Sequence, residues 1–299
     1  MKQILCFLLV LSLIFQVIYG QDKGLISIMK PGSKPEKLSG EFQFTEGPAA
    51  DTKGNVYFTD QPNDRIMIWT TKDELKTFMQ PSGRSNGLFF DKNGFLWSCA
   101  DDKNELWKID MQKNVEVVLG EYSGKPFNGP NDLWIAPDGS VFFTDPFYRR
   151  AWWDHQNMPQ EKQCVYYLSP DRKTLKRVSE DMVQPNGIIG TPDGKILYVA
   201  DIGAKKTWKY AINNDGTLEN KILFCEMGSD GMTIDSKGNV YLTGRGVTVF
   251  DKNGSRLGTI DIPENWTANV CFGGRDRKTL FITASRSLYR IQLNVRGVY

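Results

Sequence analysis

Asp51-Thr-Lys-Gly-Asn-Val-Tyr-Phe-Thr-Asp60 is a stretch in which a glycine turn leads into a run of β-branched and aromatic residues. Five later stretches repeat this pattern, namely Asp91–Cys99, Pro137–Asp145, Pro192–Asp201, Asp235–Thr243 and Arg275–Thr283. Successive turn positions are 40, 45, 55, 44 and 39 residues apart. These positions are Gly54, Gly94, Gly139, Gly194, Gly238 and Arg277. A period of about 40 to 50 residues predicts a chain built from six copies of one structural unit.

Each copy is followed by further strand-like residues. The clearest of these segments are Ile66–Thr70, Leu106–Asp110, Val165–Leu168, Thr207–Ile212, Val247–Phe250 and Leu288–Leu293. No long amphipathic helix is predicted, and four short strands per period are typical of a propeller blade. The predicted fold class is therefore all-β, a six-bladed β-propeller. A β-sandwich fits less well, because sandwiches do not repeat one pattern six times.

The end of the chain predicts how the ring closes. After Leu288–Leu293 the sequence ends, which leaves the sixth blade one strand short. Glu36–Leu38 precedes Glu46 by the spacing at which Phe78 precedes Asn86. We therefore expect this N-terminal strand to close the last blade, which would remove an open sheet edge and tie the termini together.

Composition excludes several classes of protein. The 299 residues are 40% hydrophobic and 24% charged, which is typical of a soluble globular chain and not of a disordered or coiled-coil one. Lys and Arg number 37 against 35 Asp and Glu, a net charge of +2, so no nucleic-acid partner is expected. His155 is the single histidine, which excludes histidine-cluster zinc sites and HExxH helices. Catalysis would then depend on carboxylates, amides and a hard metal ion.

The N-terminus has the features of a secretory signal. Lys2 precedes an apolar run at Ile4–Val17, and Gly20 lies immediately before Gln21. We expect residues 1–20 to be a signal peptide, residues 21–299 to be the propeller, and the mature protein to be secreted or periplasmic with no membrane attachment. A buried N-terminal strand or helix is the alternative, but the polar residues from Gln21 onward end the apolar run abruptly.

Cysteine spacing gives no disulfide framework. The mature chain has four cysteines without a CxxC pair, and they resemble residues of core strands. They are Cys99, Cys164, Cys225 and Cys271. Pairing between two of them stays open in an exported chain, and the oligomeric state cannot be deduced from the sequence.

The residue eight positions before each turn position has a carboxylate or an amide side chain in all six copies. These residues are Glu46, Asn86, Asn131, Asn186, Asp230 and Asn269. Because equivalent positions of a propeller lie at equivalent radii, and these precede the expected innermost strands, the side chains should form a ring at the mouth of the central channel.

Oxygen donors without histidine or thiolate suit a hard cation, Ca²⁺ above all, with Mg²⁺ and Mn²⁺ as alternatives. The competing interpretation is that Asn and Asp before Gly simply form turns, as Asn86-Gly87 and Asn186-Gly187 would. For Asn86 and Asn269 both interpretations stay open. Glu46 favours the metal site, because Glu is a poor turn residue.

Four motifs carry a resemblance to a known family. Glu46-Gly-Pro48, Asn128-Gly-Pro-Asn-Asp132 followed by Phe143-Thr-Asp-Pro146, Pro185-Asn-Gly187 and Ser229-Asp-Gly-Met232 resemble motifs of the SMP-30/gluconolactonase/LRE family. The likeness extends over essentially the whole mature chain and is greatest to bacterial gluconolactonase-like proteins. It implies a six-bladed propeller with one divalent metal ion in the channel.

The resemblance also implies roles for individual residues. Glu46, Asn186 and Asp230 would be the metal ligands, with Asp230 also the general base, and Asn131 would contact the substrate. Some animal relatives carry a substrate-contacting Arg two residues before the equivalent of Asn131, where this chain has Gly129. With three protein ligands, a cation of this kind keeps positions open for water and substrate. A water activated by Asp230 would attack the lactone carbonyl.

The longest interval between turns contains an insertion, Pro146–Gln160, rich in aromatic and basic residues. Aromatic faces stack on sugar rings and Arg pairs with polar oxygens, so we expect Tyr148 and Arg149 to bind substrate. The alternative is an aromatic plug that packs on the propeller surface. His155 as a catalytic base is a further, weaker hypothesis, since a loop histidine is more often solvated.

The oxygen ring indicates a metal site, and the family resemblance implies a metal-dependent lactonase that opens sugar lactones, with Ca²⁺ as the expected ion and Mg²⁺, Mn²⁺ or Zn²⁺ as alternatives. Two alternatives stay open. One is a metal-dependent esterase or organophosphate hydrolase at the same site, because a Lewis acid with a bound water attacks either centre. The other is a calcium-stabilised propeller that serves as a binding module without catalysis, because a fold alone does not give a function. Paraoxonase-like enzymes need a histidine pair that one histidine cannot provide.

Overall fold

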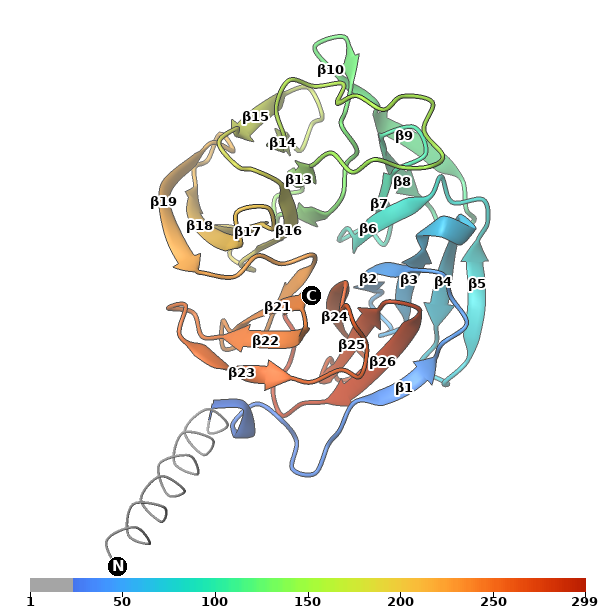
Figure 1. Ribbon diagram of the computed structural model, residues 1–299, viewed down its shortest axis with the longest axis vertical. Coiled ribbons are helices and arrows are strands. Elements are labelled where there is room, and N and C mark those ends of the chain that lie inside the picture. Colours follow the sequence, from blue (N-terminus) through green and yellow to red (C-terminus); the bar gives the residue numbers. More distant parts are fainter. Residues whose placement is uncertain (1–23) are drawn as a thin grey trace, which may run out of the picture.

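Six four-stranded antiparallel sheets surround a central channel in the computed structural model, which describes residues 24–299 (Figure 1). Blade one contains β2 (Thr45–Ala50), β3 (Val56–Asp60), β4 (Arg65–Trp69) and β5 (Leu75–Met79). Blade two contains β6 (Ser85–Phe90), β7 (Leu96–Ala100), β8 (Glu105–Ile109) and β9 (Val115–Leu119). Blade three contains β12 (Leu133–Ile135), β13 (Val141–Asp145), β14 (Cys164–Leu168) and β15 (Leu175–Ser179).

The second half of the ring has the same plan. Blade four contains β16 (Pro185–Gly190), β17 (Ile196–Asp201), β18 (Lys206–Ile212) and β19 (Leu218–Cys225). Blade five contains β20 (Met232–Ile234), β21 (Val240–Gly244), β22 (Gly246–Phe250) and β23 (Arg256–Ile260). Blade six contains β24 (Asn269–Gly273), β25 (Thr279–Ala284) and β26 (Ser287–Gln292), and its fourth strand is β1 (Glu36–Ser39). The predicted fold class is confirmed.

Short elements lie outside the blades. A small hairpin joins β10 (Glu121–Tyr122) to β11 (Lys125–Pro126), and one 3₁₀ turn, η1 (Gln61–Asn63), follows β3. Among residues 24–299, no helix is long and apolar enough to cross a membrane. The expected signal peptide, residues 1–20, lies outside the described residues.

Closure of the ring follows the prediction from Glu36–Leu38. Strand β1 pairs antiparallel with β26, with Lys37 opposite Tyr289. The Arg290 guanidinium reinforces this pairing through an ion pair with Glu36, Nε to Oε2 2.8 Å. Sixth-blade closure therefore joins strands that are more than 250 residues apart in the sequence.

The repeated aromatic and β-branched residues fill the space between blades. Phe58, Phe142 and Leu242 lie on the second strand of their blades and are fully buried, and every residue of these strands is buried because neighbouring blades cover both of their faces. The four cysteines are buried and unpaired, in agreement with their expected place in core strands.

Candidate active site

The ring of oxygen donors lies where the innermost strands of the blades begin. Glu46, Asn86 and Asn186 are the second residues of β2, β6 and β16, and Asn269 is the first of β24. We expected this ring to precede the innermost strand. Most of its residues lie inside that strand instead, because the repeated pattern forms the second strand of each blade and the strand before the turn is innermost.

Local backbone irregularity aims the ring side chains. The register between the first two strands shifts directly after Glu46 in blade one and directly after Pro185 in blade four. Blade two has the same shift after Ser85. Bulges of this kind re-aim side chains and are common beside active sites. The glycine that follows each ring residue in these blades lies within the bulge and not in a hairpin turn.

Those glycines have a steric reason. A Cβ at Gly87 would lie 2.5 Å from the backbone oxygen of Asn131 in the next blade, and one at Gly231 would overlap the Asn269 side chain. The Gly87 N–H also donates to the Asn131 oxygen at 2.8 Å. The glycines of these dipeptides therefore allow neighbouring blades to approach closely around the channel. This argues against the interpretation that the dipeptides only form turns.

Asn186 and Asp230 are joined by hydrogen bonds at the channel mouth. The Asn186 Nδ2 donates to Asp230 Oδ1 and to the Tyr148 hydroxyl, both at 2.8 Å. The Trp266 indole donates to the other oxygen of Asp230, Oδ2, at 2.7 Å. Both carboxylate oxygens are thereby held in place, with Tyr148 reaching in from the insertion.

Burial raises the proton affinity of the acidic residues at the channel mouth. Burial, followed by the negative charge of Asp230, holds the pKa of Glu46 well above its usual range. Burial likewise raises the pKa of Asp230, which the hydrogen bonds from Trp266 and Asn186 partly oppose. Burial raises the pKa of Asp132 to about 8, although the Leu133 N–H donates to its Oδ1. A positive charge placed among these carboxyls would relieve their repulsion.

The donor set fits a divalent cation of the hard type. Because the Asn186 Nδ2 is committed to two acceptors, its Oδ1 is left buried without a hydrogen-bond partner. A buried unpartnered oxygen beside two carboxylates is a suitable ligand for such a cation. Residues 24–299 contain no group of three or more His, Cys, Asp and Glu side chains that could hold a metal, so an amide ligand is required to complete this set.

The other predicted residues take different places. Asn131 is buried at the ring. Asp145, which was not predicted as a site residue, accepts hydrogen bonds from the backbone of Asn128 and Gly129, at 3.0 and 2.8 Å, and so holds the loop before blade three. Arg149 is exposed. The structure brings its neighbour Arg150, and not Arg149, into contact with Tyr148.

Sequence reasoning missed two residues of this site. Trp266 lies in the segment between β23 and β24, outside the repeated pattern, and Arg150 was one of several basic and aromatic residues in the insertion. A tryptophan three residues before the ring position Asn269 was the one available signal. Neither contact follows from spacing, because each depends on how a loop folds over the channel.

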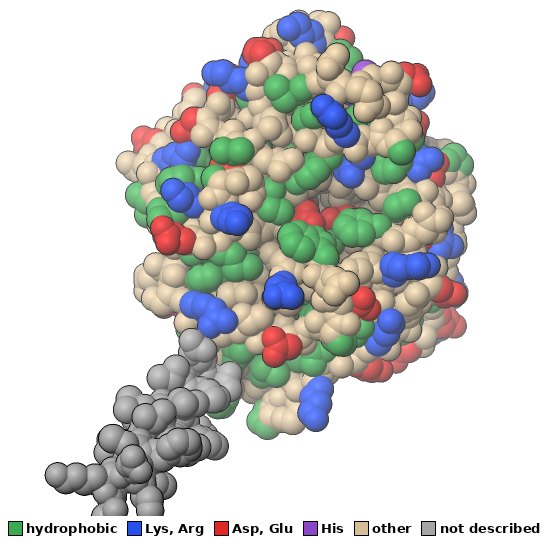
Figure 2. Space-filling model, in the orientation of Figure 1, with side chains coloured by type: hydrophobic (Ala, Val, Ile, Leu, Met, Phe, Trp, Pro, Cys, Tyr) green, Lys and Arg blue, Asp and Glu red, His purple; other side chains and the backbone are tan. Residues whose placement is uncertain are grey.

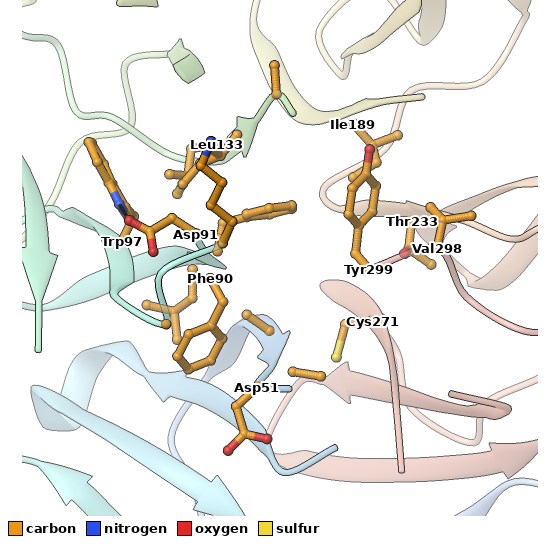
Figure 3. Close-up of a pocket in the computed structure, with 18 of the residues that line it drawn as sticks. Asp51, Phe90, Asp91, Trp97, Leu133, Ile189, Thr233, Cys271, Val298 and Tyr299 are labelled. Atoms are coloured by element: carbon orange, nitrogen blue, oxygen red, sulfur yellow. Dashed lines mark hydrogen bonds between the residues drawn. The ribbon is translucent and has the colours of Figure 1, made fainter. Parts of the chain in front are cut away.

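The channel differs at its two ends. The face shown in Figure 2 is hollowed at its middle, with acidic side chains inside the hollow and hydrophobic side chains along its edge. A cavity of about 750 Å³ is lined by the turns that follow the innermost strands and reaches inward to Asp132 and Asn269. Figure 3 shows Tyr299 and Val298 in this second space, close to Ile189 and Thr233.

Comparison with known proteins gives the family. The sequence model described as "SMP-30/Gluconolactonase/LRE-like region" matches residues 44–286. The chain belongs to the SMP-30/gluconolactonase/LRE-like family. Within this family it is similar to the gluconolactonase of Zymomonas mobilis, at 30% identity over 91% of this chain and 85% of that protein.

Two further relatives in the family show how far the likeness extends. A solved gluconolactonase from Xanthomonas campestris has a TM-score of 0.85 at 27% identity, covering 91% of this chain and 93% of that one. The diisopropyl-fluorophosphatase of Loligo vulgaris is 26% identical over 83% of this chain and 87% of its own length. The resemblance predicted from the four motifs is confirmed.

Proposed function

We propose that this protein is a lactone hydrolase that opens sugar lactones at the ring of oxygen donors. The observation that carries the proposal is the buried Asn186 Oδ1, unpartnered beside Asp230, whose own oxygens are fixed by Asn186 and Trp266. The gluconolactonase relatives support a lactone as the substrate. Glu46, Asn186 and Asp230 would hold one divalent cation, with Ca²⁺ preferred by the donor chemistry and Mg²⁺, Mn²⁺ and Zn²⁺ as alternatives.

The chain's own residues would supply the proton transfers. Asp230 would accept a proton from the attacking water as the water oxygen bonds to the carbonyl carbon. The ring C–O bond then breaks, and the leaving ring oxygen takes that proton back from Asp230. Asn186 and Trp266 keep the Asp230 carboxylate oriented throughout. Asn131 and Tyr148 would position the substrate. When bound, the cation would supply Lewis acidity toward the carbonyl oxygen.

The test combines metal removal with substitution of Asp230. The chain from Gln21 onward is stripped with a chelator, and acid release from glucono-1,5-lactone is followed as each of the four cations is added back. We expect turnover to return with one of them, and Asp230→Ala to lower it at least 100-fold, in line with the typical contribution of a general base. Asp251→Ala, in a turn of the same blade, is the matched control.

Two results would contradict the proposal. Turnover that survives complete chelation would exclude the cation, and full activity of Asp230→Ala with metal still bound would exclude Asp230 as the base. Asp230→Asn separates the two roles that Asp230→Ala removes together, since an amide can still bind the cation but cannot accept the proton. Thermal unfolding with and without each cation gives a readout of binding that does not depend on activity.

One second activity is favoured by a specific relative. The diisopropyl-fluorophosphatase of Loligo vulgaris covers most of this chain, so hydrolysis of organophosphates or other esters at the same site is the alternative. Metal-dependent thermal stabilisation without lactone turnover would favour these substrates. The same stabilisation without turnover of any ester would favour a calcium-stabilised binding module.

We also propose that the protein is exported and works outside the cytoplasm, on the basis of Lys2, the apolar run and the small residue Gly20. N-terminal sequencing of protein recovered from the cell fractions tests this. A mature chain that begins near Gln21 is expected, and an uncleaved cytoplasmic chain would contradict the proposal.

A further inference from the structure

The insertion between β13 and β14 is anchored to the rim of blades two and three. Trp153 is buried, and its indole donates to the backbone oxygen of Asp101 at 2.6 Å. A Cβ at Gly129 would lie 2.9 Å from the Trp153 ring and 3.2 Å from Asp101 Oδ1. Trp153 therefore fills the space that a side chain at position 129 would need. The loop crosses the face of the ring at this point (Figure 1).

Arg150 is the basic residue that this anchoring places beside the site. Its Nε lies 3.0 Å from Oδ2 of Asp101, which is itself only 2% exposed. Its guanidinium lies over the Tyr148 ring at 5.3 Å and over the Trp152 ring at 5.5 Å. The side chain keeps 19% of its surface open. Its Nε is buried without a hydrogen-bond partner, so Asp101 holds the guanidinium through charge, and the partial exposure of the side chain leaves other N–H donors accessible.

Tyr148 connects Arg150 to the ring of oxygen donors. The Tyr148 hydroxyl accepts a hydrogen bond from Asn186, and the same amide group donates to Asp230. Arg150 is therefore close to the atoms that would act on the substrate, without being one of the proposed ligands.

The local charges indicate what Arg150 can bind. Its single positive charge is already paired with Asp101, and the nearby acids are Glu46, Asp132 and Asp230. The carboxylates of Glu46 and Asp230 would together offset the charge of one divalent cation, so the mouth keeps no positive excess for an anionic substrate. The guanidinium N–H groups are better matched to neutral oxygens, such as the hydroxyl groups of a sugar ring.

We propose that Arg150 is a specificity residue that donates hydrogen bonds to the ring hydroxyls of a neutral polyhydroxy lactone, with Asp101 as its positioning residue. This inference rests on the proposed lactonase function and names its substrate class. It assigns the role to Arg150 in place of Arg149.

The test compares two lactones with the same six-membered ring, glucono-1,5-lactone and the unsubstituted δ-valerolactone. Arg150→Met keeps the length and apolar bulk of the side chain but removes its donors. Loss of a charged hydrogen bond corresponds to about 10- to 150-fold, so we expect kcat/KM for gluconolactone to fall by this factor, mainly through KM. The value for δ-valerolactone should change less than about twofold, because this lactone has no ring hydroxyl groups to accept hydrogen bonds from Arg150.

Three further variants sharpen the result. Arg172→Met is the matched control, because Arg172 also pairs with a carboxylate, Glu116, and lies over a Trp ring, Trp97, at 5.3 Å. Asp101→Asn should raise KM for gluconolactone alone, and the double variant with Arg150→Met should be no worse than Arg150→Met, since both act through one contact. Arg149→Met in the same assay decides between the two neighbours.

Failure of this inference differs from failure of the proposed function. Equal losses on both lactones, no loss in Arg150→Met, or an equal or larger loss in Arg149→Met would each overturn it. If the wild-type chain opens no lactone, a binding measurement still tests the role of Arg150. NMR would compare the binding of 1,5-anhydroglucitol with that of tetrahydropyran, which has the same ring without hydroxyl groups. The polyol should bind wild type more tightly than Arg150→Met, and an absence of binding or equal binding would overturn the inference.

Discussion

At the scale of single residues, the amide of Asn186 shows how the site can be both rigid and open. Its Nδ2 donates to Asp230 of the neighbouring blade and to Tyr148 of the insertion, while its Oδ1 stays without a partner inside the protein. Unpartnered buried oxygens are costly unless something binds them. Asn186 therefore orients Asp230 through its Nδ2 and offers its Oδ1 as a ligand at the same site.

Gly231 gives a prediction at this scale. Its backbone needs no left-handed conformation, so the effect of Gly231→Ala is steric: the new methyl group overlaps the Asn269 side chain. We expect a loss of about 1–3 kcal/mol in unfolding free energy, typical of overpacking, together with lower lactonase activity as Asn269 is displaced. Urea denaturation and gluconolactone turnover measure the two effects.

Gly120→Ala is the control for Gly231→Ala. A Cβ at Gly120 meets only the Glu105 side chain, at 3.7 Å, which is an ordinary contact. This variant should keep wild-type stability and activity. If Gly231→Ala behaved in the same way, close packing between ring residues of adjacent blades would not be the reason for the glycine.

At the scale of elements, the strands could be predicted because each blade repeats the same turn and the same buried residues. The pattern at Val56–Asp60 recurs, and the residue eight positions before each turn lies at or just before the start of the innermost strand in every blade. The insertion repeats nothing, and so the contact of Arg150 with Asp101 could not be predicted. Trp266 was missed for the same reason, since its contact with Asp230 depends on a connection outside the blade pattern.

Closure of blade six gives the prediction for an element. A chain that begins at Lys34 lacks Leu25 and Ile28, which pack into the core shared by blades five and six, and a chain that begins at Gly40 also lacks β1. We expect the melting temperature to fall in the first variant and to fall further in the second. The exposed edge of β26 should also promote association, which light scattering detects.

The chain from Gln21 serves as the reference for both truncations. The step between the two variants reports the contribution of β1 alone, because Lys34 precedes the whole strand. Equal melting temperatures for the two variants would contradict a role of β1 in holding the ring closed.

At the scale of the whole molecule, the channel has one polar end and one end that the C-terminus occupies. The Tyr299 hydroxyl donates to the Gly190 backbone oxygen at 2.8 Å and accepts from the Trp134 indole at 2.9 Å. Its ring packs edge-on against Phe89, and Arg277 donates to the Tyr299 backbone oxygen at 3.2 Å. These contacts connect the last residue to blades two, three, four and six, so the tail ties the ring together from inside.

Substitution of Tyr299 should therefore lower stability and leave the chemistry intact. Tyr299→Ala removes a large aromatic group that lines the cavity, and we expect a loss of about 2–4 kcal/mol in unfolding free energy. Tyr299→Phe keeps the ring and removes only the hydroxyl, with an expected loss of about 1 kcal/mol. Because Tyr299 lies at the end of the channel away from Asn186 and Asp230, kcat below the unfolding transition should stay at the wild-type value in both variants.

Urea denaturation with parallel gluconolactone assays separates the effect on stability from the effect on activity. Activity that falls while stability is kept would show that the two ends of the channel are coupled, and an Ala variant as stable as wild type would show that the tail does not brace the ring.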